Sequence, residues 1–391
     1  MNDALRVWLE PGYDHGRTGA WLLDWPGAFC WGPDRAGTLD RVHSAAHRFV
    51  EWLAEHGEQV ARPPLAEVEV VEEVGAYRLD DGYEVNATFA ADSRRVSADQ
   101  LAAQLRWLGY AREDLDALIG RLADFEAAGG RLPLEDRSSE PLASRADAGR
   151  TGDEVLRHVA GAEVWFASRL DGSARYAGPP RDGELRPYLA ATREFLIRML
   201  EVLRARDPGA TRTDGKGEHW TLAKVLRRAL YHSLDHLDEL DRRLALAEDR
   251  AAGLELRRNA ELDGEELRRL FAATGLLRRA RDTPEVTARM LAGSTETVSA
   301  WDGDRLVGFG RIITDEATNG YISTVAVTPR WQNRGVGERL MAALMEGREA
   351  LKLTLDARAG AQSFYERLGF RRSDSVTVRP RQHQTRRPEL R

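Results

Sequence analysis

The sequence predicts a multidomain α+β protein, with a small α+β N-terminal domain, an all-α four-helix bundle and a C-terminal mixed α/β domain. Two changes of pattern indicate this order. Short apolar runs between turn residues give way near residue 97 to apolar residues at helical spacing, and strands return after residue 255. A length of 391 residues also suits two or three compact units. We place the domains at residues 1–95, 97–250 and 255–378.

The composition favours a protein that handles small molecules in a reducing compartment. The formal net charge is -6 and 31% of the residues are charged, so no global field attracts nucleic acid or an anionic membrane. The single cysteine, Cys30, excludes an internal disulfide framework. The first residues are charged where a signal peptide needs an apolar core, and no run approaches the roughly 20 apolar residues of a membrane span. We therefore expect a cytoplasmic protein without a membrane or nucleic-acid partner.

Residues 1–95 combine short strands with one helix. The runs ALRVWLE and GAWLLDW indicate strands, and the segment from Thr38 to His56 has one apolar face, with Thr38 as the expected N-cap. Together with the segment DWPGAFCWG (24–32), this order resembles the HicB-like family over part of the domain. The resemblance implies a degenerate RNase H-like fold and a partner-binding or antitoxin module. A plain structural extension is the alternative.

The second domain is predicted to be helical throughout, without strands. Apolar residues recur at helical spacing in four segments that are separated by stretches rich in Gly, Pro, Ser and Asp. Four amphipathic helices with such connections favour a four-helix bundle. The expected helices span 97–127, 151–170, 184–205 and 219–247.

Three histidines of this bundle are candidate metal ligands. His232 and His236 are four residues apart and share one face of a helix, and His158 lies on the apolar stripe of another helix. Three imidazoles with an open fourth position suit zinc or nickel. The arrangement resembles the DinB-like superfamily, which implies a metal site and, in some members, a reaction with low-molecular-weight thiols. Many members continue with Arg-Gly-Gln, whereas this chain has Leu237-Asp238-Glu239. A solvated helix face is the alternative interpretation.

The third domain is predicted to alternate helices and strands. Helices are expected at 263–274 and 283–291, followed by the strands ETVSAWDGD, RLVGFGRIITDE and YISTVAVTP. A helix from Val336, the strand LKLTLDA, a helix from Ala359 and one or two final strands complete the domain. The last residues, 379–391, are basic and without apolar spacing, so we expect a mobile tail.

The most informative stretch is QNRGVG (332–337), between the strand that ends at Pro329 and the following helix. Glycines at 335 and 337 let the main chain approach a ligand, and the N–H groups and dipole of the helix favour an anion, best a pyrophosphate. The spacing Gln-x-x-Gly-x-Gly matches the GNAT acyltransferases, and AQSFYERLGF (361–370) resembles the second motif of that family.

The resemblance implies acetyl-CoA as co-substrate and an amine acceptor, either a small molecule or a protein. Tyr365 would protonate the leaving CoA thiolate, with a core aromatic as the alternative role. The family's asparagine before the second motif is replaced here by Arg358 or a neighbour, so that contact is not carried over. The residues that the resemblance places on acetyl-CoA are Val325, Ala326 and Val327 through the main chain, and Gln332, Asn333, Arg334, Gly335, Val336, Gly337 and Glu338 around the pyrophosphate.

The sequence therefore predicts an N-acyltransferase that moves an acetyl group from acetyl-CoA to a primary amine by direct attack. Asp315, Glu316 and Tyr321 are candidate bases, but a solvated turn residue is the favoured interpretation of each, and no base is assigned. One alternative makes the bundle a metal-dependent thiol transferase with an accessory acetyltransferase. Another makes the N-terminal domains recognition modules for an acceptor or partner. The acceptor and the oligomeric state are left open.

Overall fold

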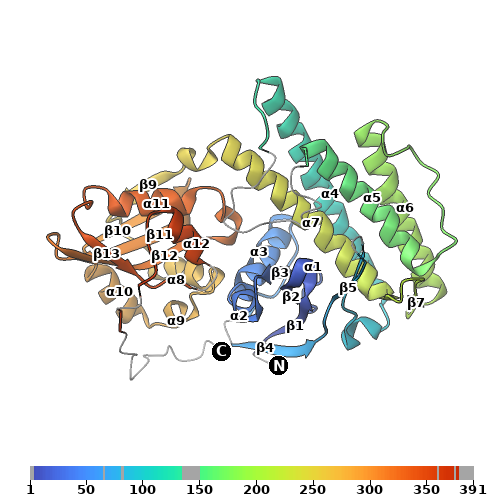
Figure 1. Cartoon of the computed structure of the whole chain (residues 1–391), viewed down its shortest axis with the longest axis horizontal. Helices are drawn as coiled ribbons and strands as arrows, with labels where there is room; N and C mark the ends of the chain where they lie inside the picture. The colour runs from blue at the N-terminus through green and yellow to red at the C-terminus, as the bar shows by residue number, and fades with distance from the viewer. Residues whose placement is uncertain are drawn as a thin grey trace. The chain divides into compact units, whose positions relative to one another are not determined.

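The computed structural model describes residues 4–64, 67–80, 83–133, 150–358, 361–373 and 376–377 (Figure 1). These residues divide into two compact units. The first contains the described residues up to Ala247 apart from His43–Arg48, and the second contains the chain from Glu248 onward together with that short piece. The predicted fold class, a multidomain chain of helices and sheets with a mixed α/β C-terminal part, is confirmed.

The first unit begins with a four-stranded sheet in the order β3-β2-β1-β4. Its strands are antiparallel except for the parallel pair of β1 and β4. The elements are β1 (Leu5–Gly12), α1 (Tyr13–Gly16), β2 (Arg17–Trp21), β3 (Phe29–Gly32), α2 (Arg35–Leu39), α3 (Val42–Glu55, apart from its residues His43–Arg48), β4 (Val68–Glu73), β5 (Tyr77–Asp80), β6 (Tyr83–Val85) and η1 (Ala90–Ser93).

The predicted N-cap at Thr38 is wrong. Asp34 caps α2 instead, because its side chain accepts a hydrogen bond from the Gly37 N–H. Thr38 lies inside α2, fully buried, and its hydroxyl donates to the carbonyls of Thr18 and Asp34. The predicted single helix is therefore a short helix followed by α3.

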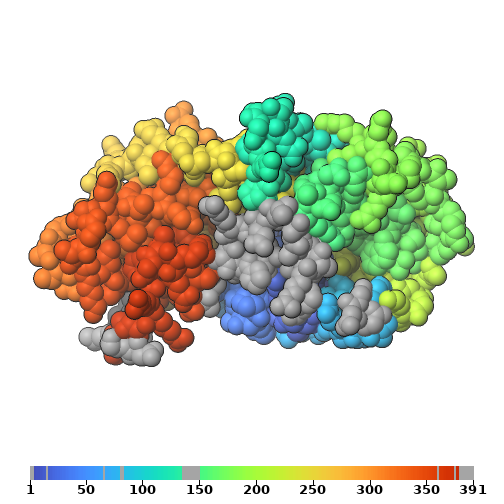
Figure 2. Space-filling view, turned by 45° about the horizontal axis from the view of Figure 1, so that its top comes forward, coloured from blue at the N-terminus to red at the C-terminus, as the bar shows by residue number. Residues whose placement is uncertain are grey.

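Four long helices follow, as the apolar spacing predicts: α4 (Ala98–Ala127), α5 (Gly152–Leu170), α6 (Leu185–Arg206) and α7 (Leu222–Ala247). Capping boxes begin α4 at Ser97 and α5 at Thr151. Helix α7 packs along α4 and α5 (Figure 1). Helices α5 and α6 also pack side by side, and Figure 2 shows them, in green, as one continuous surface.

The prediction that this region lacks strands is wrong. Residues Thr211–Thr213 and His219–Thr221 form the antiparallel pair β7 and β8. The helix expected from residue 219 consequently begins at Leu222, where the Thr221 hydroxyl accepts a hydrogen bond from the Lys224 N–H. A polar side chain at the strand end thus fixes the helix start.

The N-terminal sheet and α7 share buried contacts. Tyr231 of α7 packs with aromatic side chains that include Trp21 and Phe29, at ring-centroid distances of 5.2 and 4.3 Å. Arg227 of α7 donates two hydrogen bonds of 2.9 Å to Asp92, and both side chains are 2% exposed. The sheet and the helices therefore form one packed body.

The second unit contains a five-stranded sheet in the order β13-β12-β11-β10-β9, antiparallel except for β12 and β13. Helix α11 lies close to β11, because Cβ atoms at Gly308 and Gly310 would meet Leu340 and Leu344 within 3.0 Å. The elements are η2 (Arg250–Gly253), β9 (Glu255–Arg258), α8 (Gly264–Ala273), α9 (Leu277–Ala280), α10 (Pro284–Ala292), β10 (Glu296–Asp302), β11 (Arg305–Thr314), β12 (Asn319–Val327), η3 (Pro329–Trp331), α11 (Val336–Met345), β13 (Lys352–Leu355) and α12 (Gln362–Arg367).

The mobile tail predicted at 379–391 lies outside the described residues. The final strands expected up to residue 378 are absent where the structure describes this segment, at 371–373 and 376–377. Within the described part of the chain, none of the helices combines the length and apolar character that a membrane span requires.

Candidate functional site

The loop between β12 and α11 presents main-chain N–H groups at one point. Asn333 and Gly335 have φ values of 59° and 84°, so the chain turns through left-handed conformations just before the helix. The Gln332 side-chain amide donates to the Val327 carbonyl over 3.0 Å and ties the loop to the end of β12. Among the residues that the structure describes, no side chain caps α11, which leaves its first N–H groups available to an anion. This loop contains the predicted residues Gln332, Asn333, Arg334, Gly335, Val336, Gly337 and Glu338.

Arg334 differs from its neighbours in the loop. Its side chain is buried, with 5% exposed, and donates to the Arg330 carbonyl. The guanidinium therefore supports the loop from inside. We expect any contact of Arg334 with an anion to come from the main chain.

Strand β12 has an edge that is only partly paired. Its parallel pairing with β13 covers Asn319 to Ile322 and then stops, whereas the pairing with β11 continues to Val327. Within the described residues, the strand from Ser323 to Val327 therefore has no partner on the β13 side. Unpaired main-chain groups of a strand can hydrogen-bond an extended ligand. The predicted residues Val325, Ala326 and Val327 lie on this stretch.

Tyr365 lies on α12, next to the start of α11. A Cβ at Gly337 would come within 3.1 Å of the Phe364 ring. Helix α12 is therefore packed against the loop of residues 332–337, the glycine loop. Burial of the Tyr365 ring raises the pKa of its hydroxyl above the ordinary value of tyrosine, and the Arg358 guanidinium partly opposes this shift. The hydroxyl is therefore protonated at neutral pH, as a general acid must be.

Arg358 has a structural role. Its guanidinium donates to the carbonyls of Thr274 and Gly275, over 3.2 and 2.6 Å, at the end of α8. These carbonyls are acceptors that a helix leaves unsatisfied at its C-terminus. Arg358 thus connects the end of β13 to α8.

The candidate bases near the strand ends take part in local structure. Asp315 accepts hydrogen bonds from the N–H groups of Ala317, Thr318 and Asn319, which hold the pKa of its carboxyl well below the usual range. Glu316 forms an ion pair with Arg348. Both residues therefore build the turn between β11 and β12.

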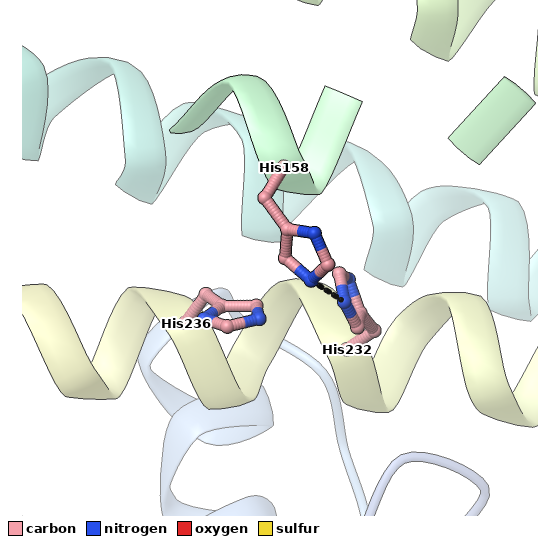
Figure 3. A group of neighbouring side chains, drawn as sticks. All are labelled: His158, His232 and His236. Carbon is pink, nitrogen blue, oxygen red and sulfur yellow. Dashed lines mark hydrogen bonds between the residues drawn. The ribbon is translucent and has the colours of Figure 1, made fainter. Parts of the chain in front are cut away.

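The three predicted histidines of the first unit meet in one cluster. His158 projects from α5 and His232 and His236 from α7, and their ligand nitrogens all lie within 4.8 Å of one another (Figure 3). The Nε2 atoms of His158 and His232 are 3.1 Å apart. Zinc–nitrogen bonds of about 2.0–2.1 Å at tetrahedral angles separate two ligand nitrogens by roughly 3.3–3.4 Å. The His158 and His232 nitrogens are therefore close to the separation of two zinc ligands, and the set, within 4.8 Å, would have to contract to hold the ion.

The surroundings keep His232 in the form that a metal needs. Burial, with the neighbouring imidazoles of His236 and His158, holds the pKa of His232 well below its ordinary value, so the ring stays neutral. His236 Nδ1 lies 2.9 Å from a carboxylate oxygen of Glu239. Burial alone would raise the pKa of Glu239, but its contacts with His236 and Arg243 hold it below the ordinary value. Neutral imidazole is the metal-binding form of histidine, so the donor set fits zinc or nickel.

Sequence reasoning missed two of these neighbours, although their spacing was visible. Glu239 and Arg243 follow His236 by three and seven residues, which places all three on one face of α7. The incomplete pairing of β12 left no comparable trace in the sequence.

Comparison with known proteins defines the class of the second unit. Residues 277–381 match the family model described as "Acetyltransferase (GNAT) domain". This match identifies the C-terminal part of the chain as a GNAT acetyltransferase domain, and the class of enzyme is that of acyl-CoA-dependent N-acetyltransferases. The resemblances of residues 1–95 to HicB-like proteins and of 97–250 to DinB-like proteins stay predictions.

Two solved structures illustrate the likeness. A GNAT-family acetyltransferase from Streptococcus pneumoniae TIGR4 is 22% identical, with 33% of this chain and 99% of that chain covered and a TM-score of 0.29. An acetyltransferase from Trypanosoma brucei is 25% identical, with 32% and 99% covered and a TM-score of 0.27. No curated protein matches the chain.

Proposed function

We propose that the chain transfers an acetyl group from acetyl-CoA to a primary amine. The observation that carries this proposal is the match of residues 277–381 to the GNAT domain, joined to the packing of α12, the helix that contains Tyr365, against the glycine loop. The N–H groups at the start of α11 would bind the pyrophosphate. The unpaired edge of β12 would hold the pantetheine arm through main-chain hydrogen bonds.

The proposed reaction is a direct transfer. The acceptor amine loses a proton, and its nitrogen attacks the thioester carbonyl to form a C–N bond. The C–S bond then breaks and the thiolate leaves. Tyr365 donates its hydroxyl proton to that sulfur and regains a proton from solvent. The products are an amide and CoA. A location in the cytoplasm belongs to the same proposal and is in keeping with a sequence that contains a single cysteine, Cys30.

Binding and turnover test the proposal separately. Titration calorimetry with acetyl-CoA should give saturable binding, and Gly335→Val should weaken it, because a β-branched residue is strained at a φ of 84°. A thiol-release assay over amine classes, including polyamines, aminoglycosides and peptide amines, should then identify the acceptor class. Absence of acetyl-CoA binding by the folded wild type would refute the function.

We propose as a second function that His158, His232 and His236 bind zinc or nickel. The observation that favours it is the convergence of three imidazoles from two helices. A metal with an open coordination position supplies Lewis acidity to a bound water or thiol. The bundle could thus be a thiol transferase, with the acetyltransferase as its accessory. Elemental analysis of the wild type against His158→Ala tests the site, and equal metal content would remove His158 as a ligand.

We also propose that the N-terminal region recognises the acceptor or a partner protein. Tyr77 and Leu79 of β5 support this, since both are apolar and about half exposed. Replacing both with serine should alter the choice among large acceptors while acetylation of a small amine is unchanged. Identical selectivity of the variant and wild type would argue against the role.

A further inference from the structure

His236 has a carboxylate partner on the side away from the histidine cluster. Glu239 Oε2 lies 2.9 Å from His236 Nδ1, one helical turn later on α7. The ionised carboxylate only accepts hydrogen bonds, so His236 Nδ1 must carry the ring proton. The lone pair is then on Nε2. His158 and His232 also present their Nε2 atoms to one another (Figure 3).

The carboxylate of Glu239 is itself held at both oxygens. Its Oε1 accepts from Arg243 Nη1 over 3.1 Å, and Arg243 is one of the most buried side chains, with 1% exposed. Arg243 donates further to the carbonyls of Pro133 and Arg150, over 2.7 and 2.9 Å. The guanidinium therefore has main-chain anchors beyond α7. A carboxylate fixed in this way holds the histidine ring in one orientation.

We propose that Glu239 is the residue that positions His236 for metal binding, and that Arg243 holds Glu239 in place. This inference rests on the proposed metal site. A hydrogen bond from a ligating imidazole to a carboxylate fixes the ring tautomer and increases the basicity of the coordinating nitrogen. A helix-surface ion pair would be exposed and would not contact a ligand. Glu239 is 18% exposed and contacts His236 directly.

The chain offers a matched control one residue away. Asp238 and Arg242 form the same kind of carboxylate–guanidinium pair on α7, at 2.9 Å, with side-chain exposures of 25% and 9%. The hydrogen bond from His236 Nδ1 goes to Glu239 and does not involve Asp238. Asp238→Ala therefore removes a similar ion pair without changing the partner of His236.

Metal affinity and a spectroscopic signature test the proposal in the full-length protein. Zinc affinity, measured against a chromophoric chelator, should fall about 10- to 100-fold in Glu239→Ala. Glu239→Gln should recover most of that affinity, because its amide oxygen still accepts from His236 Nδ1. The visible absorption bands of bound Co²⁺ should shift in Glu239→Ala and stay unchanged in Asp238→Ala.

The outcomes separate the two proposals. If the wild type binds no zinc or cobalt, the metal site itself is refuted, and the role of Glu239 with it. If the wild type binds and Glu239→Ala binds with equal affinity and an unchanged cobalt spectrum, only the role of Glu239 is refuted. Should Glu239→Ala fail to fold, Glu239→Asp gives the same test. It keeps the charge but withdraws the carboxylate from His236, so wild-type affinity in that variant would also overturn the inference.

Discussion

Tyr365 is held in its place by packing. Its ring contacts Phe364 and Phe370, with centroids 4.9 and 6.1 Å away, and burial raises the pKa of its hydroxyl. The ordinary tyrosine pKa is about 10, so the raised value keeps the proton on the hydroxyl throughout the neutral range. The residue is therefore available as an acid at every pH at which the protein is expected to work.

Tyr365→Phe should lower kcat about 10²- to 10⁴-fold, the usual contribution of a general acid, while the Kd of acetyl-CoA stays nearly constant. In the wild type, loss of the proton should lower kcat only above pH 10, because the pKa of Tyr365 is raised. That alkaline decline should be missing in the variant. Steady-state rates from pH 6 to 11 measure it. Equal kcat in both proteins would leave Tyr365 as a core aromatic.

His232 makes the stability of the metal-free protein dependent on pH. Its folded-state pKa lies well below the ordinary value of about 6.5. Below pH 6.5 the unfolded chain binds a proton that the folded chain does not bind, so the free energy of unfolding falls as pH falls. The decline ends once the folded-state pKa is passed. Urea denaturation of chelated protein between pH 5 and 7 should show this slope, and His232→Gln should reduce it.

The sequence predicted which candidate side chains come together better than it predicted their hydrogen-bond partners. The three histidines were expected to meet because helical spacing places them on known faces, and the structure brings them together. The glycine loop was identified from a motif whose residues are adjacent in sequence. The roles of Asp315 and Glu316 could not be decided in the same way. Each depends on which N–H group or guanidinium the folded chain brings within reach.

Helix α7 contributes to two different parts of the first unit. Its histidines face α5, whereas Arg227 and Tyr231 contact the N-terminal region. The helix bounds were predictable to within a few residues from apolar spacing, but the start at Leu222 depends on the hydroxyl of Thr221. The pair of β7 and β8 was missed because strands of three residues are too short to show an alternating pattern.

Asp92→Ala should destabilise the first unit strongly, because it leaves the Arg227 guanidinium buried without its carboxylate. Removing one partner of a buried ion pair costs about 3–5 kcal/mol. Glu73→Ala is the control, since Glu73 pairs with Arg35 at the surface, where an ion pair contributes at most about 1 kcal/mol. Chemical denaturation of both variants gives the comparison. If Asp92→Ala lowers the free energy of unfolding as little as Glu73→Ala does, the buried ion pair between Asp92 and Arg227 of α7 does not stabilise the first unit.

At the scale of the whole molecule, the division at Ala247 predicts two separable responses to ligands. Scanning calorimetry should resolve two transitions. Acetyl-CoA should raise the free energy of unfolding of the second unit, and zinc that of the first, each by about 2.7 kcal/mol at a hundredfold excess over Kd. The temperature of the corresponding transition should rise with it. Asp92→Ala should lower only the zinc-sensitive transition. A single transition that responds to both ligands would show that the units unfold together.

The incomplete pairing of β12 has a consequence for the enzyme without its co-substrate. From Ser323 to Val327, an alternation of buried and half-buried residues carries main-chain groups that lack a strand partner on one side, within the described residues. An open edge of this kind is a template for pairing with another chain. Acetyl-CoA would cover that edge as a substitute strand. We therefore expect the co-substrate to act as a solubility factor as well, so that light scattering on prolonged incubation rises more slowly when it is bound.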